Sequence, residues 1–414
     1  MELNNNIIAG LDLGTTKVCI LVGRLTENRC IEIIGIGEAP STGVKQGTII
    51  DINSTVEAIK SARHQAELMS GYKIKNVFTG IADSQIKSFN DSGMWVLKGG
   101  PITQHDIDKA LKNTERAIKI DSSRKLLEMI PQEYVIDQQR GIRSPLGKSG
   151  VRLEPKVHII TASANTVEDI KRCINKAGLE LMGEPILEPL ASGYAVLGEE
   201  ETQVGVVMVD IGGGTTDMTI FHENSLIHSS VIPIAGNKIT SDISHLLRVL
   251  IPDAEQLKKK HGYAISRMAE REEYITISTV GGAKNNQQVP SNLLSEIIQA
   301  RVEQIFESIA IEMKKSGKLR DVSCGMVFTG GTSLLRGLKE LAELYFEAPV
   351  RIGTPKNFNG LKKIVSSPVY STAMGLVLYG AQDQKVNKRS VPVKGNGLVT
   401  KTKTAIKGLC DDYF

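Results

Sequence analysis

Residues 205–217 have the sequence Gly-Val-Val-Met-Val-Asp-Ile-Gly-Gly-Gly-Thr-Thr-Asp, and residues 7–17 have the sequence Ile-Ile-Ala-Gly-Leu-Asp-Leu-Gly-Thr-Thr-Lys. Each segment contains an apolar strand, an aspartate, a glycine-containing turn and two threonines, and a second apolar strand follows. The segments lie about 200 residues apart, near the starts of the two halves of the chain. This repeat predicts a duplicated hairpin unit whose two copies face each other across a cleft.

The chemistry of these turns suits a nucleotide polyphosphate. Glycines let backbone N–H groups approach phosphate oxygens. Four threonine hydroxyls are further donors: Thr15, Thr16, Thr215 and Thr216. Lys17 can pair with a phosphate, while Asp12 and Asp210 end their strands and could hold a hydrated Mg²⁺. A single such turn is typical of an ordinary hairpin, so the prediction of phosphate binding depends on the repeat.

Two more glycine positions follow apolar strands. Gly330 and Gly331 come after the strand predicted over residues 322–328, and Gly236 ends a strand near residue 234. In the cleft interpretation they approach the adenosine, whereas taken alone they are ordinary strand ends. The chain has no G-x-x-x-x-G-K-[ST] motif, and no G-x-G-x-x-G follows the first strand, which argues against P-loop and Rossmann sites.

Composition argues against several classes of protein. Apolar residues are 41% and charged residues 23% of the 414, as in globular proteins. Aromatic residues are only 4%, which argues against stacking on nucleic-acid bases. The first 384 residues carry 43 basic and 44 acidic side chains, so we expect no nucleic-acid partner. The five cysteines lack metal or redox spacing, and no signal peptide or long apolar run is evident, which predicts a cytosolic protein.

Two segments differ from the rest of the chain. Residues 84–162 combine a polar helix with a loop rich in glycine, proline and serine, which predicts an inserted domain. From Leu398 onward, apolar residues recur at helical spacing and lysines flank them, which is typical of a helix on an anionic membrane surface. The apolar face is thin, and Asp411 and Asp412 oppose anionic lipid, so a frayed terminus is the alternative.

The paired hairpins, together with Gly330-Gly331-Thr332, resemble the actin-like ATPase superfamily. Other segments resemble the FtsA family of bacterial cell-division proteins over essentially all of residues 7–380. They are residues 130–137 (Ile-Pro-Gln-Glu-Tyr-Val-Ile-Asp), 150–154, 157–161, 209–215, 232–237, 241–243 and 370–376.

The resemblance implies an α/β, actin-like (ribonuclease H-like) fold of duplicated domains around a nucleotide cleft, with an inserted subdomain and a C-terminal amphipathic helix. It divides the chain as follows: 1–83 with 163–195 and 360–382 (subdomain 1A), 84–162 (subdomain 1C), 196–226 with 301–359 (subdomain 2A), 227–300 (subdomain 2B), 383–397 (linker) and 398–414 (membrane-targeting helix).

The resemblance also implies a function. We expect ATP and Mg²⁺ in the cleft, at most slow hydrolysis, and self-assembly into filaments at the cytoplasmic face of the bacterial inner membrane. The expected partners are the C-terminal tail of the tubulin-like protein FtsZ, which the filament tethers to the membrane, and later division proteins, which contact the inserted subdomain. Ile406, Leu409 and Tyr413 are the expected membrane contacts.

Carried over by position, the family's sites fall on the following residues. Phosphate contacts are Gly14, Thr15, Thr16, Lys17, Gly213, Gly214, Thr215 and Thr216; water-mediated metal contacts are Asp12 and Asp210; adenosine contacts are Gly236, Glu255, Lys258, Gly330 and Gly331. Glu188 matches a water-positioning group, although a carboxylate at a helix start is an equal alternative. Glu255 and Lys258, three residues apart, form an exposed ion pair in the alternative interpretation.

The sequence departs from the family in the expected FtsZ-binding surface. Ala283, directly before Lys284, stands where the family leads us to expect a basic residue. Residues 299–301 (Gln-Ala-Arg) replace a more acidic, proline-containing version. Lys284 and Arg301 remain candidates for binding an acidic tail, with a solvated helix charge as the alternative for Arg301.

A small-molecule kinase of the same superfamily is the alternative function. A kinase needs a base positioned for a substrate hydroxyl, and the inserted segment shows no obvious constellation of that kind. A chaperone would need a separate peptide-binding domain, for which no length remains. The amphipathic tail favours the filament protein over both.

Overall fold

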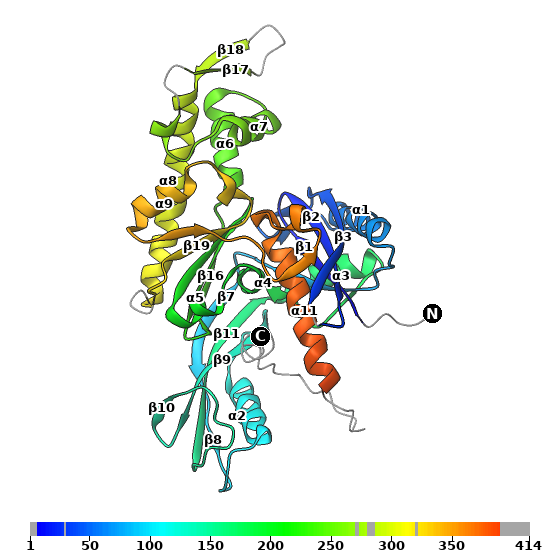
Figure 1. Cartoon of the computed structure of the whole chain (residues 1–414), viewed down its shortest axis with the longest axis vertical. Coiled ribbons are helices and arrows are strands. Elements are labelled where there is room, and N and C mark those ends of the chain that lie inside the picture. Colours follow the sequence, from blue (N-terminus) through cyan, green and yellow to red (C-terminus); the bar gives the residue numbers. More distant parts are fainter. Residues whose placement is uncertain (1–5, 29, 270–272, 280–285, 319–321, 390–414) are drawn as a thin grey trace.

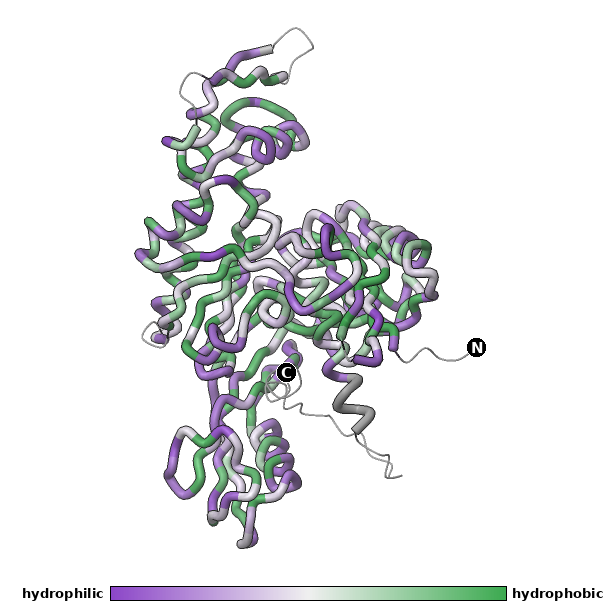
Figure 2. Tube along the Cα trace, viewed as in Figure 1, coloured by the Kyte–Doolittle hydropathy of each residue, from purple (hydrophilic) through white to green (hydrophobic). Residues whose placement is uncertain are grey.

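The computed structural model describes residues 6–28, 30–269, 273–279, 286–318 and 322–389. Two lobes stand side by side at mid-height in Figure 1, and a smaller unit extends from the second lobe at each end of the long axis. Figure 2 shows that apolar residues concentrate in the strands of the two central sheets, while hydrophilic residues cover the outer helices.

The first lobe contains a sheet with the strand order β12-β6-β1-β2-β3-β21. Its strands are β12 (Glu180–Leu181), β6 (Asn76–Ile81), β1 (Ile7–Leu13), β2 (Lys17–Leu25), β3 (Ile31–Pro40) and β21 (Phe358–Gly360), with β13 (Ile186–Leu187) also on β6. Strands β1, β2 and β3 are antiparallel neighbours, and β6 is parallel to β1.

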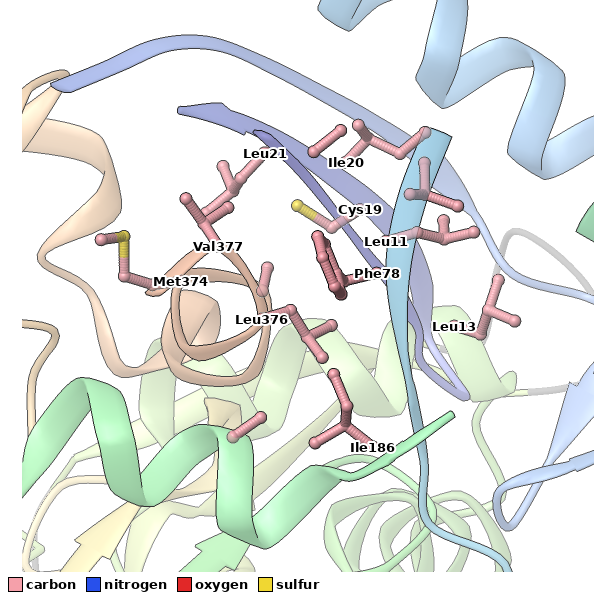
Figure 3. Close-up of a cluster of buried hydrophobic side chains, with 14 of the residues drawn as sticks. Leu11, Leu13, Cys19, Ile20, Leu21, Phe78, Ile186, Met374, Leu376 and Val377 are labelled. Carbon is pink, nitrogen blue, oxygen red and sulfur yellow. The ribbon is translucent and has the colours of Figure 1, made fainter. Parts of the chain in front are cut away.

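Two pairs of helices complete the first lobe. Helix α1 (Ile52–Ser70) packs on β3 and contacts α3 (Ala164–Lys176), while α11 (Ser371–Arg389) packs on β1 and contacts α4 (Glu188–Val196). In Figure 3, Cys19 and Leu21 of β2 and Phe78 of β6 lie on the side of the sheet that faces Leu376 and Val377 of α11, whereas Leu11, Leu13 and Ile20 lie on the other side. Short elements complete the connections: β4 (Val44–Lys45), β5 (Thr48–Ile49), α10 (Lys362–Val365) and η4 (Pro368–Tyr370).

The second lobe repeats this plan in a sheet of order β16-β15-β14-β19-β20. The strands are β16 (Ser225–Ile232), β15 (Thr216–His222), β14 (Val206–Ile211), β19 (Met326–Thr329) and β20 (Val350–Ile352). As in the first lobe, three consecutive strands are antiparallel neighbours and the fourth lies parallel to the first of them. The accompanying helices are α5 (Glu199–Val204), α8 (Ser291–Ser316), η3 (Gly331–Leu334) and α9 (Leu338–Phe346).

The segment 84–162 forms a separate unit with its own core. Its sheet contains β7 (Lys87–Ser92), β8 (Trp95–Val96), β9 (Arg124–Ile136), β10 (Gln139–Ile142) and β11 (Arg152–Ser163), and α2 (Gln104–Ala117) packs on β11. Buried Ile107, Leu111 and Val157 belong to this core. The unit contacts the second lobe, since Ser88 Oγ donates to Ser229 O of β16 at 2.7 Å.

The opposite end carries α6 (Gly236–Leu247), α7 (Ile251–His261), η1 (Ser266–Met268), β17 (Tyr274–Ser278) and β18 (Asn286–Pro290). The predicted limits of this unit, 227 and 300, do not coincide with breaks between elements. Residue 227 lies inside β16, which belongs to the large sheet, and residue 300 lies inside the 26-residue helix α8. A continuous helix and a shared sheet therefore join this unit to the second lobe.

Candidate functional site

Each glycine-threonine turn connects the two strands of one hairpin, and the two hairpins have the same strand register. In the first lobe Leu13 pairs with Val18, and in the second Ile211 pairs with Thr216, so each turn contains four residues after its last strand pair. Superposing the registers places residues 14–17 on residues 212–215. Thr15 and Thr16 therefore correspond to glycines of the second turn, and the two threonine pairs are offset by two residues.

The two turns touch each other. A Cβ atom added to Gly213 would overlap Cγ2 of Thr16, and one added to Gly214 would overlap Oγ1 of Thr15. Side chains on the first turn thus occupy space that the second turn leaves free. The sequence prediction that the repeats face each other agrees with this geometry.

An aspartate lies near the end of the first strand of each hairpin, just before the turn. Asp12 is 8% exposed and Asp210 is 7% exposed. Burial raises the pKa of Asp12 to about 7, with the charge of Asp210 adding to the shift. Burial also raises the pKa of Asp210, although Ser192 Oγ donates to its carboxylate at 2.6 Å and stabilises the charge.

A third aspartate, Asp217, was not among the predicted site residues. It lies directly opposite Asp210 on β15, and it is 4% exposed. Its Oδ1 has no hydrogen-bond partner among the described residues, and burial, reinforced by Asp210, raises its pKa well above the ordinary value. The signal in the sequence was an acidic residue in the second strand of the motif, directly after the two threonines.

Glu188, the predicted water-positioning group, begins α4 and packs against Gly80 of β6. Burial, followed by the charges of Asp12 and Asp217, raises its pKa well above the ordinary value. The structure therefore brings Glu188 to the same acidic site as the aspartates.

The Lys17 side chain extends from the first turn toward residues of the first lobe. Its ammonium group pairs with Glu38 and lies 3.9 Å from the ring centroid of Tyr370. Burial raises the pKa of Tyr370 to about 12, so the phenol stays neutral. The cation that was predicted to contact a phosphate is thus held beside the first turn by an acid and an aromatic ring.

Other backbone and hydroxyl groups hold the second turn. The N–H groups of Gly236 and Asn237 donate to Gly212 O and Gly213 O at 3.2 and 2.8 Å. Thr332 Oγ1 donates to Gly212 O at 2.8 Å. Thr216 is fully buried and donates to Ile234 O at 2.7 Å, so in this structure its hydroxyl braces the turn.

The predicted adenosine residues gather on the side of the second turn near α6. Lys258 Nζ donates to Gly236 O at 3.2 Å and pairs with Glu255 at 2.7 Å. Thr240 Oγ1 also donates to Glu255. Gly330 adopts a φ of +83° and approaches Asp210 so closely that a Cβ would overlap its Oδ1, while Gly331 follows at the exposed edge. Glu255 and Lys258 are thus part of a partly buried network and not the exposed pair of the alternative interpretation.

Arg301 does not present a free charge in this structure. Its guanidinium makes two contacts to the Asp242 carboxylate, at 2.5 and 3.0 Å, and a third to Gln304. Lys284 and the predicted membrane contacts Ile406, Leu409 and Tyr413 lie outside the described residues.

The acidic site fits a cation held through water better than one held directly. Within the described part of the chain, no three acidic, histidine or cysteine side chains are grouped so as to ligate a metal ion. The unpartnered Oδ1 of Asp217 and the raised pKa values of buried Asp12 and Asp210 nevertheless indicate uncompensated negative charge. Buried charge of this kind is costly unless it is paired, so the residues fit a hydrated divalent ion.

Comparisons with known proteins assign the family. Residues 207–375 match the family model described as "Cell division protein FtsA", and residues 83–161 match "SHS2 domain inserted in FTSA". Cell division protein FtsA of Pseudomonas aeruginosa is 40% identical over 393 residues, which cover 95% of this chain and 93% of the relative. The chain belongs to the FtsA family. The FtsA proteins of Neisseria meningitidis and Escherichia coli K12 are 43% and 35% identical, over 91% and 92% of this chain and 91% of each relative.

Solved structures confirm the actin-like fold expected of an FtsA protein. The PilM-PilN type IV pilus biogenesis complex matches with a TM-score of 0.66 at 15% identity, covering 90% of this chain and 98% of that one. MreB5 of Spiroplasma citri bound to ADP matches with a TM-score of 0.56 at 15% identity, covering 94% and 100%. The fold and the family predicted from the sequence are therefore confirmed. No helix in the described ranges is long and apolar enough to span a bilayer.

Proposed function

We propose that this FtsA-family protein binds ATP with Mg²⁺ between the two turns. The contact of Thr15 and Thr16 with Gly214 and Gly213 is the observation that carries the proposal, because it brings two sets of phosphate-binding groups to one place. MreB5, which shares the fold, has been crystallised with ADP and with AMPPNP.

Each lobe supplies different groups to the proposed site. The first turn would supply hydroxyls and, once it leaves Glu38, the Lys17 ammonium, and the second would supply backbone N–H groups that glycine leaves accessible. Asp12 and Asp210 would hold the water shell of Mg²⁺, which neutralises phosphate charge when bound. Gly236, Lys258 and Gly330 would face the nucleoside.

Hydrolysis, in this proposal, is slow at most. A water-positioning carboxylate accepts a hydrogen bond from the attacking water. The pKa of Glu188 is raised, first by burial and then by neighbouring aspartates, which favours its protonated form. A protonated Glu188 is a poor acceptor for that hydrogen bond.

The proposed cellular role is that of a membrane-bound filament. The protein would polymerise at the cytoplasmic face of the inner membrane, anchor there through residues 398–414 after the linker 383–397, and tether the FtsZ tail. MamK, which matches with a TM-score of 0.50 at 12% identity over 93% of this chain and 99% of that one, forms a double helical filament. The inserted unit 84–162 would contact later division proteins.

Calorimetry of the full chain with Mg-ATP tests the proposed site. Asp210→Asn keeps the shape of the side chain but removes its charge, and we expect at least tenfold weaker binding with Mg²⁺ and a smaller change with EDTA. Asp253→Asn, an exposed aspartate on α7, is the matched control and leaves both affinities unchanged. Equal affinities for parent and Asp210→Asn with Mg²⁺ would contradict the proposed metal role.

The FtsZ contact has a separate test, because Arg301 is paired with Asp242. An acidic peptide must displace Asp242 to reach the guanidinium. We expect Asp242→Asn to strengthen binding of an FtsZ C-terminal peptide in fluorescence anisotropy, and Arg301→Ala to weaken it. If Arg301→Ala has no effect, Arg301 is not part of the FtsZ surface.

A further inference from the structure

A pocket with a volume of about 40 Å³ lies where the two lobes and the inserted unit meet. Leu190 and Tyr194 of α4, Phe221 of β15 and Ile130 of β9 form apolar walls, and Leu197 completes them. A volume of this size holds about three waters or the end of one aliphatic side chain. The pocket is separate from the acidic site, and nothing in the proposed nucleotide chemistry uses it.

The rim of the pocket is acidic. Glu199 lines the pocket, and Glu200 follows it at the start of α5, with both side chains exposed. Neither forms an ion pair with any residue that the structure describes, whereas the next residue, Glu201, pairs with Arg351 at 2.5 Å. Two uncompensated negative charges therefore lie beside an apolar cavity.

The chain ends in a segment of matching chemistry. Residues 398–414 combine apolar residues with three lysines, Lys401, Lys403 and Lys407, while the two acidic residues, Asp411 and Asp412, come after the last lysine. Residues 385–414 carry seven basic side chains against two acidic ones, whereas residues 1–384 are close to neutral, so the net positive charge of the chain lies at this end.

The tail can reach the pocket. Tyr379 of α11 packs against the pocket residue Tyr194, with ring centroids 6.1 Å apart. From Tyr379 to the end of α11 at Arg389 the helix rises about 15 Å. The eight residues 390–397 span up to about 27 Å when extended, which is more than the distance needed to return to the level of Tyr379.

We propose that residues 398–414 dock intramolecularly at this pocket. An aliphatic side chain of the tail enters the space between Leu190 and Phe221, and lysines of the tail pair with Glu199 and Glu200. The pocket then competes with an anionic bilayer for the same segment, and polymerisation along a membrane favours the bilayer because linked anchors add avidity. Only the competition with lipid rests on the proposed membrane function; the docking itself does not.

Disulfide trapping in the full chain tests the docking without lipid. The tail contains Cys410, and Thr202→Cys places a second thiol at the pocket. Thr276→Cys, at an exposed position of β17 in the far unit, is the matched control with the same native cysteines. With diamide added as the two-electron oxidant, we expect the disulfide between Cys410 and the thiol introduced by Thr202→Cys, identified by mass spectrometry, to form at a rate independent of protein concentration. It should form at least tenfold faster than the disulfide between Cys410 and the thiol introduced by Thr276→Cys. Equal rates would overturn the proposal.

Charge reversal tests the competition with lipid. The variant E199K/E200K should slow the trapping several-fold and raise the fraction of protein that sediments with phosphatidylglycerol vesicles. The control E307K/E340K changes the net charge equally at exposed sites on α8 and α9, so it corrects for general attraction to the vesicles. If neither parent nor variants bind vesicles while fast trapping persists, the membrane function fails and the docking stands. If the two double variants bind vesicles equally and trapping is unselective, the docking fails alone.

Discussion

The first and second turns have the same register and different side chains. The first carries Thr15, Thr16 and Lys17 at positions where the second carries two glycines and Thr215. The glycines of one turn are required by the threonines of the other, because a Cβ on Gly213 would overlap Thr16. Duplication thus preserved the backbone, while side chains diverged until one turn fits against the other.

The hairpins also differ one layer below the turns. Asp12 lies opposite Cys19, whereas Asp210 lies opposite Asp217. Cys19 is fully buried among apolar side chains of the first lobe, as Figure 3 shows, and Asp217 has a buried oxygen without a partner among the described residues. Only the second hairpin has a second acid at this position, so in the proposed site a cation would lie nearer the second lobe.

Making the first hairpin resemble the second should have the largest effect. Cys19→Asp buries a carboxyl group in a core that has no partner for it, and we expect the free energy of unfolding to fall by at least about 3 kcal/mol. Cys19→Ser is the control for lost packing and should cost about 1–2 kcal/mol. Urea denaturation measures both. Equal losses in the two variants would show that the two hairpins do not differ in this way.

The pH dependence of stability should follow the raised pKa of Asp12. Folding raises this pKa from 3.8 to about 7, chiefly by burial, so the folded chain binds more protons than the unfolded chain between these values. The stabilising contribution of Asp12 is complete below pH 3.8 and is lost as the pH rises to about 7. Between pH 5 and pH 8, the free energy of unfolding of the parent should therefore fall by about 2–3 kcal/mol more than that of Asp12→Asn.

Urea titrations at both pH values, without nucleotide or Mg²⁺, provide this measurement. Asp253→Asn again serves as the control, because that aspartate is exposed. A parent chain and an Asp12→Asn variant with parallel pH profiles would show that Asp12 is not held in an unfavourable ionised state.

Substitutions of Thr216 and Thr15 should show which threonine hydroxyl stabilises the fold and which is left available for a phosphate. The Thr216 hydroxyl donates to the partly buried Ile234 O, so Thr216→Val removes this hydrogen bond and should lower stability by about 1 kcal/mol. Thr15→Val in the first turn, whose hydroxyl is only partly buried, should change stability by about 0.5 kcal/mol at most. Thermal unfolding compares the two, and a larger loss for Thr15→Val would reverse the assignment.

Much of this architecture followed from the sequence, because apolar strands around a glycine turn are a local pattern. The strand β7 did not, since its sequence Lys-Ser-Phe-Asn-Asp-Ser is polar and mostly exposed at a sheet edge. The two-residue offset between the threonine pairs needed the strand register, which spacing alone does not give. The pairing of Arg301 with Asp242 joins residues 59 apart, so no local pattern could have indicated it.

For the candidate site, too, local patterns in the sequence indicated some residues and missed others. Residues adjacent to the turns were predicted because they are part of the motif, and Glu255 and Lys258 were predicted through the family resemblance; the structure brings both groups to the second turn. Asp217 was missed although it ends the quoted stretch, because its significance lies in burial opposite Asp210. Burial and cross-strand pairing are properties of the folded chain.

A double-mutant cycle on Gly213 and Thr16 tests most directly whether the two turns form one site. Thr16→Ser removes only the methyl group that a new Cβ on residue 213 would overlap, and it keeps the hydroxyl. We expect Gly213→Ala to weaken Mg-ATP binding about tenfold or more, Thr16→Ser about twofold, and the double variant to return to within about threefold of the parent. Independent effects that simply multiply in the double variant would contradict a site built from both turns.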